Sequence, residues 1–539
     1  MAVADLWQLG LTFNLLLHIQ GVAAMPKLVL NVVLLLHLCL WGCTTNTIIR
    51  SNIDKSDPDK CNFQAHGDLA HYDKRATDEC SKYSIEDHVD YTLGVVEFDD
   101  QGWLYNRRQM DRLMEELEKQ TRDGSDLSIF IYVHGWKHNA EFCDSNVCCF
   151  RETLKQMNVL EDKYQTEYQH LGWERRKVFG VYVGWRGLSL RGPDFIRSLS
   201  FYSRKNAATH VALGSTRELL GKIKDFYERK NAPAGQERSR KNTKQLPMQS
   251  DAAETKRNPA GTRLLTVGHS FGGLVVYTAV AQALMESAIE PKPFDREQLV
   301  KPFGDLVFIV NPAFEGSRFE PLHQIAKHRD YAPYQPPVFV AVTSEADQAT
   351  RKAFPIGRWA NSLLEKYSAG LDGDKLDHLA EQQREADVQT IGHTLRYRTH
   401  RLEYTPSKVS EAEVNKKQVN VGECGCPYRS GINELFANAN MAQENAEWKL
   451  DRAENIQQGH RKPNWIRRYA SDGNTLRHEP GDLSNGPDNP FWVVYADKKI
   501  IADHNGFYTP LFLNFVRHTF DDSLHLWRLA KEPTPARAK

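Results

Sequence analysis

Short apolar runs recur along this chain, and they constrain its fold more than any other feature. Each run is rich in β-branched and aromatic residues and is too short for a long buried helix. Continuous apolar runs of this length are typical of strands that are buried on both faces of a parallel sheet. The runs cover residues 128–136, 177–185, 263–267, 305–310 and 337–344.

Helical stretches separate these runs. Residues 109–120 and 208–227 have apolar side chains at helical spacing, and the apolar stretch LVVYTAVAQALMESA occupies residues 274–288. Strands that alternate with helices at this spacing indicate βαβ units. The sequence therefore predicts an α/β fold with a mainly parallel sheet flanked by helices.

Polar segments divide the chain around this core. Residues 44–90 lack clear periodicity and are expected to form a tether and an irregular N-terminal segment. The core spans 91–404 and contains a charged, flexible loop at about 228–262, which is almost free of large apolar residues. Residues 405–489 form a polar insertion with the character of a lid or rim. The last strand and the closing helix follow at 490–530.

Residues 1–43 have the layout of an export signal. Lys27 precedes the apolar stretch LVLNVVLLLHLCLWG, and Cys43 follows that stretch directly. The residues before Cys43 resemble a bacterial lipobox, in which the cysteine is lipidated. Because residues 1–24 contain no Lys or Arg, we expect translation to begin at Met25. The lipobox-like residues predict an exported lipoprotein of the bacterial cell envelope, anchored in the membrane by its lipid. The alternatives are a plain cleaved signal and an uncleaved anchor.

Charge and cysteine content argue against two classes of function. Lys and Arg together number 69, as do Asp and Glu, and this balance argues against a nucleic-acid partner, which requires a basic excess. Seven cysteines remain after Cys39 and Cys43. Their clusters at 143–149 and 424–426 do not have the spacing of a zinc site. We therefore expect disulfides in an oxidising compartment and no metal.

The segment GHSFGG stands where a predicted strand becomes a predicted helix. Gly268 to Gly272 satisfy the pattern G-x-S-x-G, with Ser270 at its centre. A serine in this position sits on a strained turn, and glycines on both sides let strand and helix approach closely. The free N–H groups of the helix N-terminus favour a developing negative charge there. The sequence predicts that Ser270 is a nucleophile; the alternative is a glycine-rich turn with a serine N-cap.

With this turn, the chain resembles the α/β-hydrolase-fold serine hydrolases, in the broad lipase, esterase and thioesterase group with GHSxGG turns. The resemblance covers about 90–350 and 490–525. It implies a Ser-Asp/Glu-His order along the chain, an acid after a late strand and a histidine after the last strand. It also implies an α/β-hydrolase fold and a reaction that needs no cofactor.

The acid and the histidine are assigned by their places along the chain. Asp347 and Glu345 both follow the run 337–344, and Asp347 is preferred. His504 lies between the last apolar run and the closing helix, as the resemblance requires. The competing histidines are His393 and His400, whereas His518 falls within the closing helix and is expected to be structural.

An oxyanion hole needs two backbone N–H groups beside the nucleophile. The resemblance assigns one to Phe271, immediately after Ser270, and the other to Trp136 in IYVHGWKHNA. His134, in the same segment, is expected to be a structural hydrogen-bonding residue.

These residues together predict hydrolysis of a carboxylic ester or thioester through an acyl-enzyme, with a small-molecule or lipid ester as substrate. One alternative is a surface lipoprotein that uses the hydrolase fold for binding without catalysis. A peptidase or acyltransferase on the same scaffold is the other.

Overall fold

The structure is a computed structural model of the whole chain. It describes residues 46–57, 61, 79–188, 201–232, 261–290, 299–332, 335–361, 365, 367, 374–406, 418–421, 426–429, 440, 443–444, 446–451, 466–469 and 473–531. The predicted signal peptide with Cys43, and most of the predicted loop 228–262, lie outside these residues. The chain divides into two compact units, residues 1–45 with 188–202 and residues 46–187 with 203–539. The second unit contains the candidate site and is described here.

A twelve-stranded sheet runs through the second unit, in the order β1-β2-β3-β5-β4-β6-β7-β8-β14-β9-β13-β12. The strands from β3 to β9 in this order are all parallel. They are β3 (Tyr91–Phe98), β5 (Lys177–Trp185), β4 (Leu127–Val133), β6 (Arg263–His269), β7 (Leu306–Val310), β8 (Phe339–Ser344), β14 (Phe491–Ala496) and β9 (His400–Tyr404). The predicted α/β class with a mainly parallel sheet is therefore confirmed.

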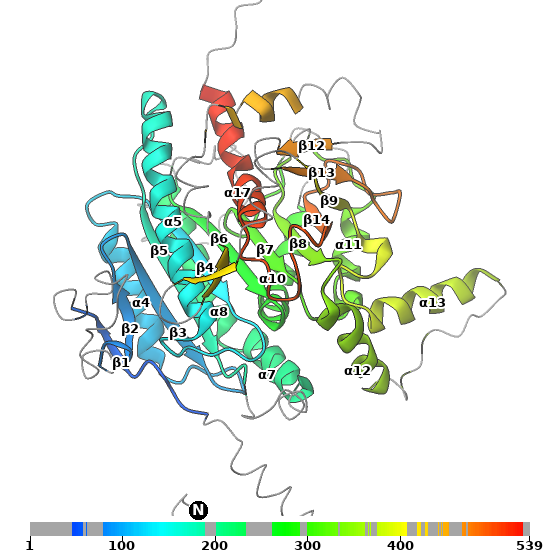
Figure 1. The fold of residues 1–539 in the computed structure, drawn as a ribbon, viewed down its shortest axis with the longest axis horizontal. Helices are drawn as coiled ribbons and strands as arrows, with labels where there is room; N and C mark the ends of the chain where they lie inside the picture. The colour runs from blue at the N-terminus through cyan, green and yellow to red at the C-terminus, as the bar shows by residue number, and fades with distance from the viewer. Residues whose placement is uncertain are drawn as a thin grey trace, which may run out of the picture. The chain divides into compact units, whose positions relative to one another are not determined.

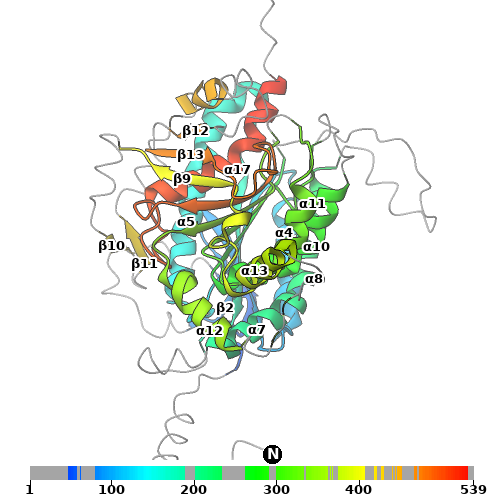
Figure 2. The same cartoon turned by 90° about the vertical axis from the view of Figure 1, so that its right-hand side faces the viewer.

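Helices cover both faces of this sheet (Figures 1 and 2). One face carries α4 (Arg107–Gln120), α8 (Thr216–Lys230), α10 (Phe271–Ile289) and α11 (Glu320–Ala326). The other face carries α5 (Ser145–Tyr168) and the closing helix α17 (Pro510–Lys531). The connection from β4 through α5 to β5 runs across the sheet in the opposite direction to the connections through α4, α8 and α10. Because parallel crossovers are right-handed, α5 lies on the opposite face from α4 and α10.

This reversal makes the boundary between β4 and β6 a topological switch point of the sheet. The two strands are neighbours, yet the chain after β4 turns to the α5 face, whereas the chain after β6 turns to the α10 face. Ligand and catalytic sites of open α/β sheets lie at such switch points, outside the carboxyl ends of the strands. The loop that starts at His134 and the turn at Ser270 follow these two strands directly.

The segment 44–90 was predicted to be a tether without regular structure, but two strands lie within it. β1 (Asn52–Lys55) pairs with β2 (Tyr83–Asp87), and β2 pairs with β3. The inner face of β2 carries the buried carboxylate of Glu86, which forms ion pairs with Arg50 at 3.0 Å and Arg151 at 2.6 Å. A strand that buries a compensated charge has no apolar pattern, so hydrophobicity alone does not reveal it.

The described parts of the predicted insertion 405–489 are also strands. β13 (Asn474–His478) and β12 (Ile466–Tyr469) extend the sheet beyond β9 with antiparallel pairing. β10 (Gln418–Val421) and β11 (Cys426–Arg429) form a separate two-stranded sheet. The remaining described helices are α7 (Phe201–Leu213), α12 (Phe354–Asn361) and α13 (Asp374–Val388).

Disulfides tie distant segments together, as the cysteine content led us to expect. Cys61 pairs with Cys80 in the N-terminal segment, and Cys149 of α5 pairs with Cys426 of β11. Cys143 is also disulfide-bonded, whereas Cys148 carries a buried thiol. The Cys149–Cys426 bond closes a separation of 277 residues. It fastens the β10–β11 sheet to the helix that follows β4.

Within the described residues, α10 is the one helix long and apolar enough to cross a membrane. It begins directly after Ser270, and 56% of its apolar stretch is buried inside the protein. Burial against the sheet explains why this helix is apolar on most sides.

Candidate active site

Ser270 occupies a sharp turn between β6 and α10. Its backbone has φ 57° and ψ −119°, a conformation that L-residues rarely adopt. A Cβ at Gly272 would collide with the carbonyl oxygen of Val133, and one at Gly268 would lie 2.6 Å from the carbonyl oxygen of Gly272. The Ser270 N–H donates to the Val310 carbonyl at 3.0 Å. The glycines of G-x-S-x-G are thus required by the close approach of strand, turn and helix.

The structure brings Ser270, His504 and Asp347 together. His504 Nε2 lies 2.9 Å from Ser270 Oγ, and His504 Nδ1 lies 2.8 Å from Asp347 Oδ2. Ser270 is 4% exposed, Asp347 is fully buried, and the His504 side chain is 21% exposed. The three side chains form one line of hydrogen bonds that is reached from solvent at the histidine.

Glu345, the alternative acid, lies apart from this line. Its Oε1 accepts the Lys498 N–H at 3.2 Å, and its side chain is partly exposed. Asp347 takes the inner position because its carboxylate points back into the turn that follows β8.

Four donors surround the Asp347 carboxylate. Oδ1 accepts the N–H groups of Ala349 and Thr350 at 3.0 and 3.1 Å. Oδ2 accepts the Thr350 hydroxyl at 2.5 Å and His504 Nδ1–H. Burial by itself would raise the pKa of Asp347, but the interactions with His504 and Thr350 outweigh it and hold this pKa below its ordinary value. Asp347 is therefore ionised and fixed in orientation at neutral pH.

Two residues that the sequence analysis missed hold the backbone of His504. The His504 carbonyl accepts Asn311 Nδ2–H and His269 Nε2–H, both at 2.9 Å. Asn311 ends β7 in the left-handed region, with φ 43°, and its Oδ1 accepts the Ser344 N–H at 2.9 Å. Asparagine tolerates this conformation better than most residues. The one sequence signal was an Asn directly after an apolar run, which is too common a feature to assign a role.

The other candidate histidines lie elsewhere. His393 Nε2 contacts the Thr350 hydroxyl at 3.1 Å, and burial lowers the pKa of His393 to about 4. His400 is a buried residue of β9, where burial lowers its pKa well below the ordinary value. His518 lies in α17 beside Glu444. Of these, His393 is connected to the line of hydrogen bonds, because the Thr350 hydroxyl that it contacts donates to Asp347.

The loop after β4 lies directly against the nucleophile. A Cβ at Gly135 would lie 2.8 Å from Ser270 Cβ. His134 donates from Nδ1 to the Gly135 carbonyl and accepts the Trp185 N–H at Nε2, at 2.9 and 3.1 Å. Burial lowers the pKa of His134 to about 4, so the ring is neutral at pH 7. His134 is thus the structural residue that the sequence predicted, and it positions the peptide that leads into Trp136.

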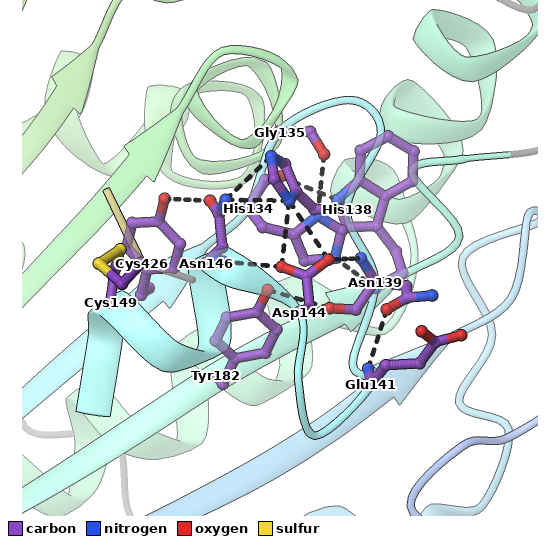
Figure 3. A network of polar contacts seen from close by, with 12 residues as sticks. His134, Gly135, His138, Asn139, Glu141, Asp144, Asn146, Cys149, Tyr182 and Cys426 are labelled. Atoms are coloured by element: carbon purple, nitrogen blue, oxygen red, sulfur yellow. Dashed lines mark hydrogen bonds and ion pairs between the residues drawn. A yellow bond between two sulfur atoms is a disulfide. The ribbon is translucent and has the colours of Figure 1, made fainter. Parts of the chain in front are cut away.

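A second network holds the far end of this loop (Figure 3). Asp144 caps α5 by accepting the Asn146 N–H at 2.8 Å, and it also contacts His138 Nδ1 at 3.0 Å. The Asn146 side-chain amide contacts the His138 ring at 3.0 Å and accepts the Tyr132 hydroxyl at 2.6 Å. Trp136 therefore lies between two fixed points, the buried His134 and the capped start of α5.

No metal-ligating cluster of three or more His, Cys, Asp or Glu side chains occurs in the part of the chain that the structure describes. Comparison with known proteins identifies no relative: no family model, no curated protein and no solved structure matches the chain. The chemistry of the site therefore has to be judged from its own geometry. A buried serine that is hydrogen-bonded to a histidine, which is in turn held by a carboxylate, is an arrangement suited to nucleophilic catalysis.

Proposed function

We propose that this protein is a serine hydrolase of the α/β-hydrolase fold that cleaves carboxylic esters or thioesters. The observation that carries the proposal is the line from Ser270 Oγ through His504 to Asp347, at 2.9 and 2.8 Å, on a turn with positive φ. The resemblance of GHSFGG and its flanking elements to lipases and esterases supports the same chemistry.

The proposed reaction uses His504 as a proton carrier. His504 takes the proton from Ser270 Oγ as that oxygen attacks the carbonyl carbon, and Asp347 stabilises the imidazolium that forms. His504 then gives the proton to the leaving alcohol or thiol as its bond to carbon breaks. Water, deprotonated by His504, attacks the acyl-serine and releases the carboxylic acid.

Two backbone amides are proposed to bind the oxyanion. Phe271 N–H starts α10, where the helix dipole favours negative charge. Trp136 N–H belongs to the loop whose Gly135 packs against Ser270. Because the backbone supplies both donors, side-chain changes at Trp136 are expected to cost less activity than changes at Ser270.

The proposed substrates are small-molecule or lipid esters. We propose that Cys43 carries the lipid that holds the protein at the membrane of the bacterial cell envelope. A protein anchored in this way has access to lipid esters of the membrane.

Hydrolysis of p-nitrophenyl butyrate by the purified full chain tests the proposal. Wild type is compared with Ser270→Ala and with Ser287→Ala, a matched change near the other end of α10, where the hydroxyl donates to the Leu284 carbonyl. We expect Ser270→Ala to lose at least about a thousandfold in kcat and Ser287→Ala to keep its activity. Equal activity in all three proteins, or none in folded wild type, would refute the proposed function.

A further inference from the structure

A cavity of about 90 Å³ lies between α5, α17 and the sheet, on the face opposite α10. Its walls are mainly aromatic and aliphatic. They include Phe130, Leu265, Phe308, Phe507 and Phe512. Protein interiors are normally close-packed, with few voids larger than a water molecule, so a cavity of this size is a candidate site for a small apolar ligand.

The lining of the cavity is elongated along two elements. Arg263, Leu265 and Val267 line it in succession along β6, a distance of about 13 Å at the rise of a strand. Phe512 and Phe520 line it along α17 over about 12 Å at the rise of a helix. Its volume is smaller than the engineered cavity of about 150 Å³ that holds benzene. An elongated space of this volume fits a chain better than a ring.

The charged groups at one end of the cavity are paired with one another. Arg263 contacts Asp521 at 3.1 Å, Tyr164 donates to Asp521 at 2.5 Å, and Arg517 forms two hydrogen bonds with Glu444 at 2.7 and 2.8 Å. These pairs leave no excess charge that would select an ionic head group. Glu161, the other charged lining residue, lies 3.5 Å from Arg176. Apart from Thr153 and the tyrosine hydroxyls, the rest of the lining is aromatic or aliphatic, which favours hydrocarbon.

An entrance lies between the two helices. Met157 of α5 and Leu513 and Val516 of α17 line the cavity and are only partly buried. Ser270 and His504 are not among the lining residues. A chain can therefore enter from the outer face, between α5 and α17, without passing the serine.

The inner end of the cavity is one layer of side chains away from the proposed active site. Phe507 lines the cavity and packs on His269, with ring centroids 4.6 Å apart, and His269 packs on His504 at 5.0 Å. Tyr132 also lines the cavity, and its hydroxyl donates to Asn146 in the network that holds the loop before α5. An occupant thus contacts side chains that support both halves of the site.

We propose that this cavity is a binding site for a short alkyl chain. Apolar cavities of this kind stay free of water and bind apolar molecules. The chain has two conceivable sources, a separate amphiphile or the acyl group of the ester bound at Ser270, and both present the same hydrocarbon. The entrance between the helices favours the separate molecule.

Calorimetric titration of the full chain with linear alcohols from ethanol to decanol tests the site. The protein is kept in digitonin, a detergent without an alkyl chain that would compete. We expect affinity to rise about fourfold for each added CH₂ until the chain fills the cavity, and then to fall. Affinity that increases with every carbon would indicate unspecific partitioning and overturn the proposal.

Substitutions that fill the cavity entrance show whether the alcohols bind in the cavity. Val516→Phe fills the entrance from α17, and Met157→Phe does so from α5 should the first variant fail to fold. Thr166→Phe is the matched control, because Thr166 is an exposed residue of α5 outside the cavity lining. We expect either filling variant to lose at least tenfold in affinity for 1-hexanol and the control to bind like wild type. Unchanged binding in a folded filling variant would overturn the proposal.

Enzyme kinetics distinguishes a separate amphiphile from the acyl group of the bound ester. Unlike the calorimetric titration, this experiment rests on the proposed function. A change in the rate of p-nitrophenyl butyrate hydrolysis by 1-hexanol that persists at saturating ester and is lost in Val516→Phe supports a separate molecule, because attack of the alcohol on the acyl-serine would not depend on Val516. Competitive inhibition that is lost in Val516→Phe supports the acyl chain. A catalytically inactive protein would refute the proposed function and leave the calorimetric test of the cavity intact.

Discussion

His504 is held from two sides, and both matter for its proposed role. Asp347 fixes the ring, while His269 and Asn311 fix the backbone through the His504 carbonyl. A catalytic histidine that shifts by a fraction of an ångström loses its alignment with the serine. His269 and Asn311 are therefore positioning residues, since they act through His504.

Removal of the His269 hydrogen bond tests this role. His269→Phe keeps the ring packing on Phe507 but loses the donor, and we expect about a tenfold fall in kcat with little change in KM. His269→Gln supplies an amide donor and should recover part of the loss. Equal kcat in the Phe and Gln variants would show that the His269 side chain fills space without orienting His504.

Thr350 contributes to the lowered pKa of Asp347. Thr350→Val removes the hydroxyl donor, and we expect the pKa of Asp347 to rise toward its ordinary value. The His504–Asp347 pair exists while Asp347 is ionised and is lost as pH falls through that pKa. The acid side of the kcat/KM profile should therefore move to higher pH in Thr350→Val and stay in place in Thr350→Ser. Superimposable profiles for Val and wild type would contradict this role.

Ser270, Asp347 and His504 could be proposed from the sequence because each stands at a fixed place relative to a strand end. The roles of His269, Asn311 and Thr350 could not be predicted from the sequence, because they are hydrogen bonds between segments that lie far apart along the chain. The ends of β7 and β8 and the loop that carries His504 meet at Asn311, and no pattern within a single sequence indicates these contacts.

Among the elements, the buried parallel strands were predictable and the edge strands were not. The runs at 128–136 and 337–344 became β4 and β8 because they bury both faces and hence contain apolar residues throughout. β2 and β13 carry buried Glu86 and His478, and the β10–β11 sheet depends on a disulfide. Ion pairs and covalent bonds replace hydrophobic burial there, and apolar periodicity does not reveal them.

The Cys149–Cys426 disulfide fastens an element far along the chain to α5. Its replacement by two alanines releases a closed segment of 277 residues. A long closed loop is expected to contribute about 2–4 kcal/mol to the free energy of unfolding. Urea unfolding of Cys149→Ala/Cys426→Ala should show this decrease in the free energy of unfolding. The wild type under reducing conditions should show a decrease at least as large, because its other disulfides are also reduced. A double variant as stable as wild type would show that α5 and β11 hold together without the bond.

At the scale of the whole molecule, buried neutral histidines make the fold sensitive to acid. Burial lowers the pKa of His134 and His393 to about 4, and it lowers those of His269 and His400 well below the ordinary value. The same side chains accept protons near pH 6.5 once the chain unfolds. The unfolded state therefore binds more protons below pH 6.5, and stability falls as pH falls toward 4.

Urea unfolding at pH 7 and pH 5 measures this dependence. We expect wild type to lose several kcal/mol between the two, and His393→Gln to lose about 2 kcal/mol less. His210→Gln, a change at an exposed histidine of α7, should follow wild type. Equal losses in the His393 and His210 variants would show that His393 is not kept neutral by the fold.

The most direct test of the central claim is to identify the residue that a fluorophosphonate modifies. The full chain is labelled, digested and analysed by peptide mass spectrometry, with Ser270→Ala as the comparison. The account predicts a single stoichiometric adduct on Ser270, absent from Ser270→Ala and from wild type unfolded in urea before labelling. An adduct on another residue, or an unlabelled Ser270 in folded wild type, would contradict it.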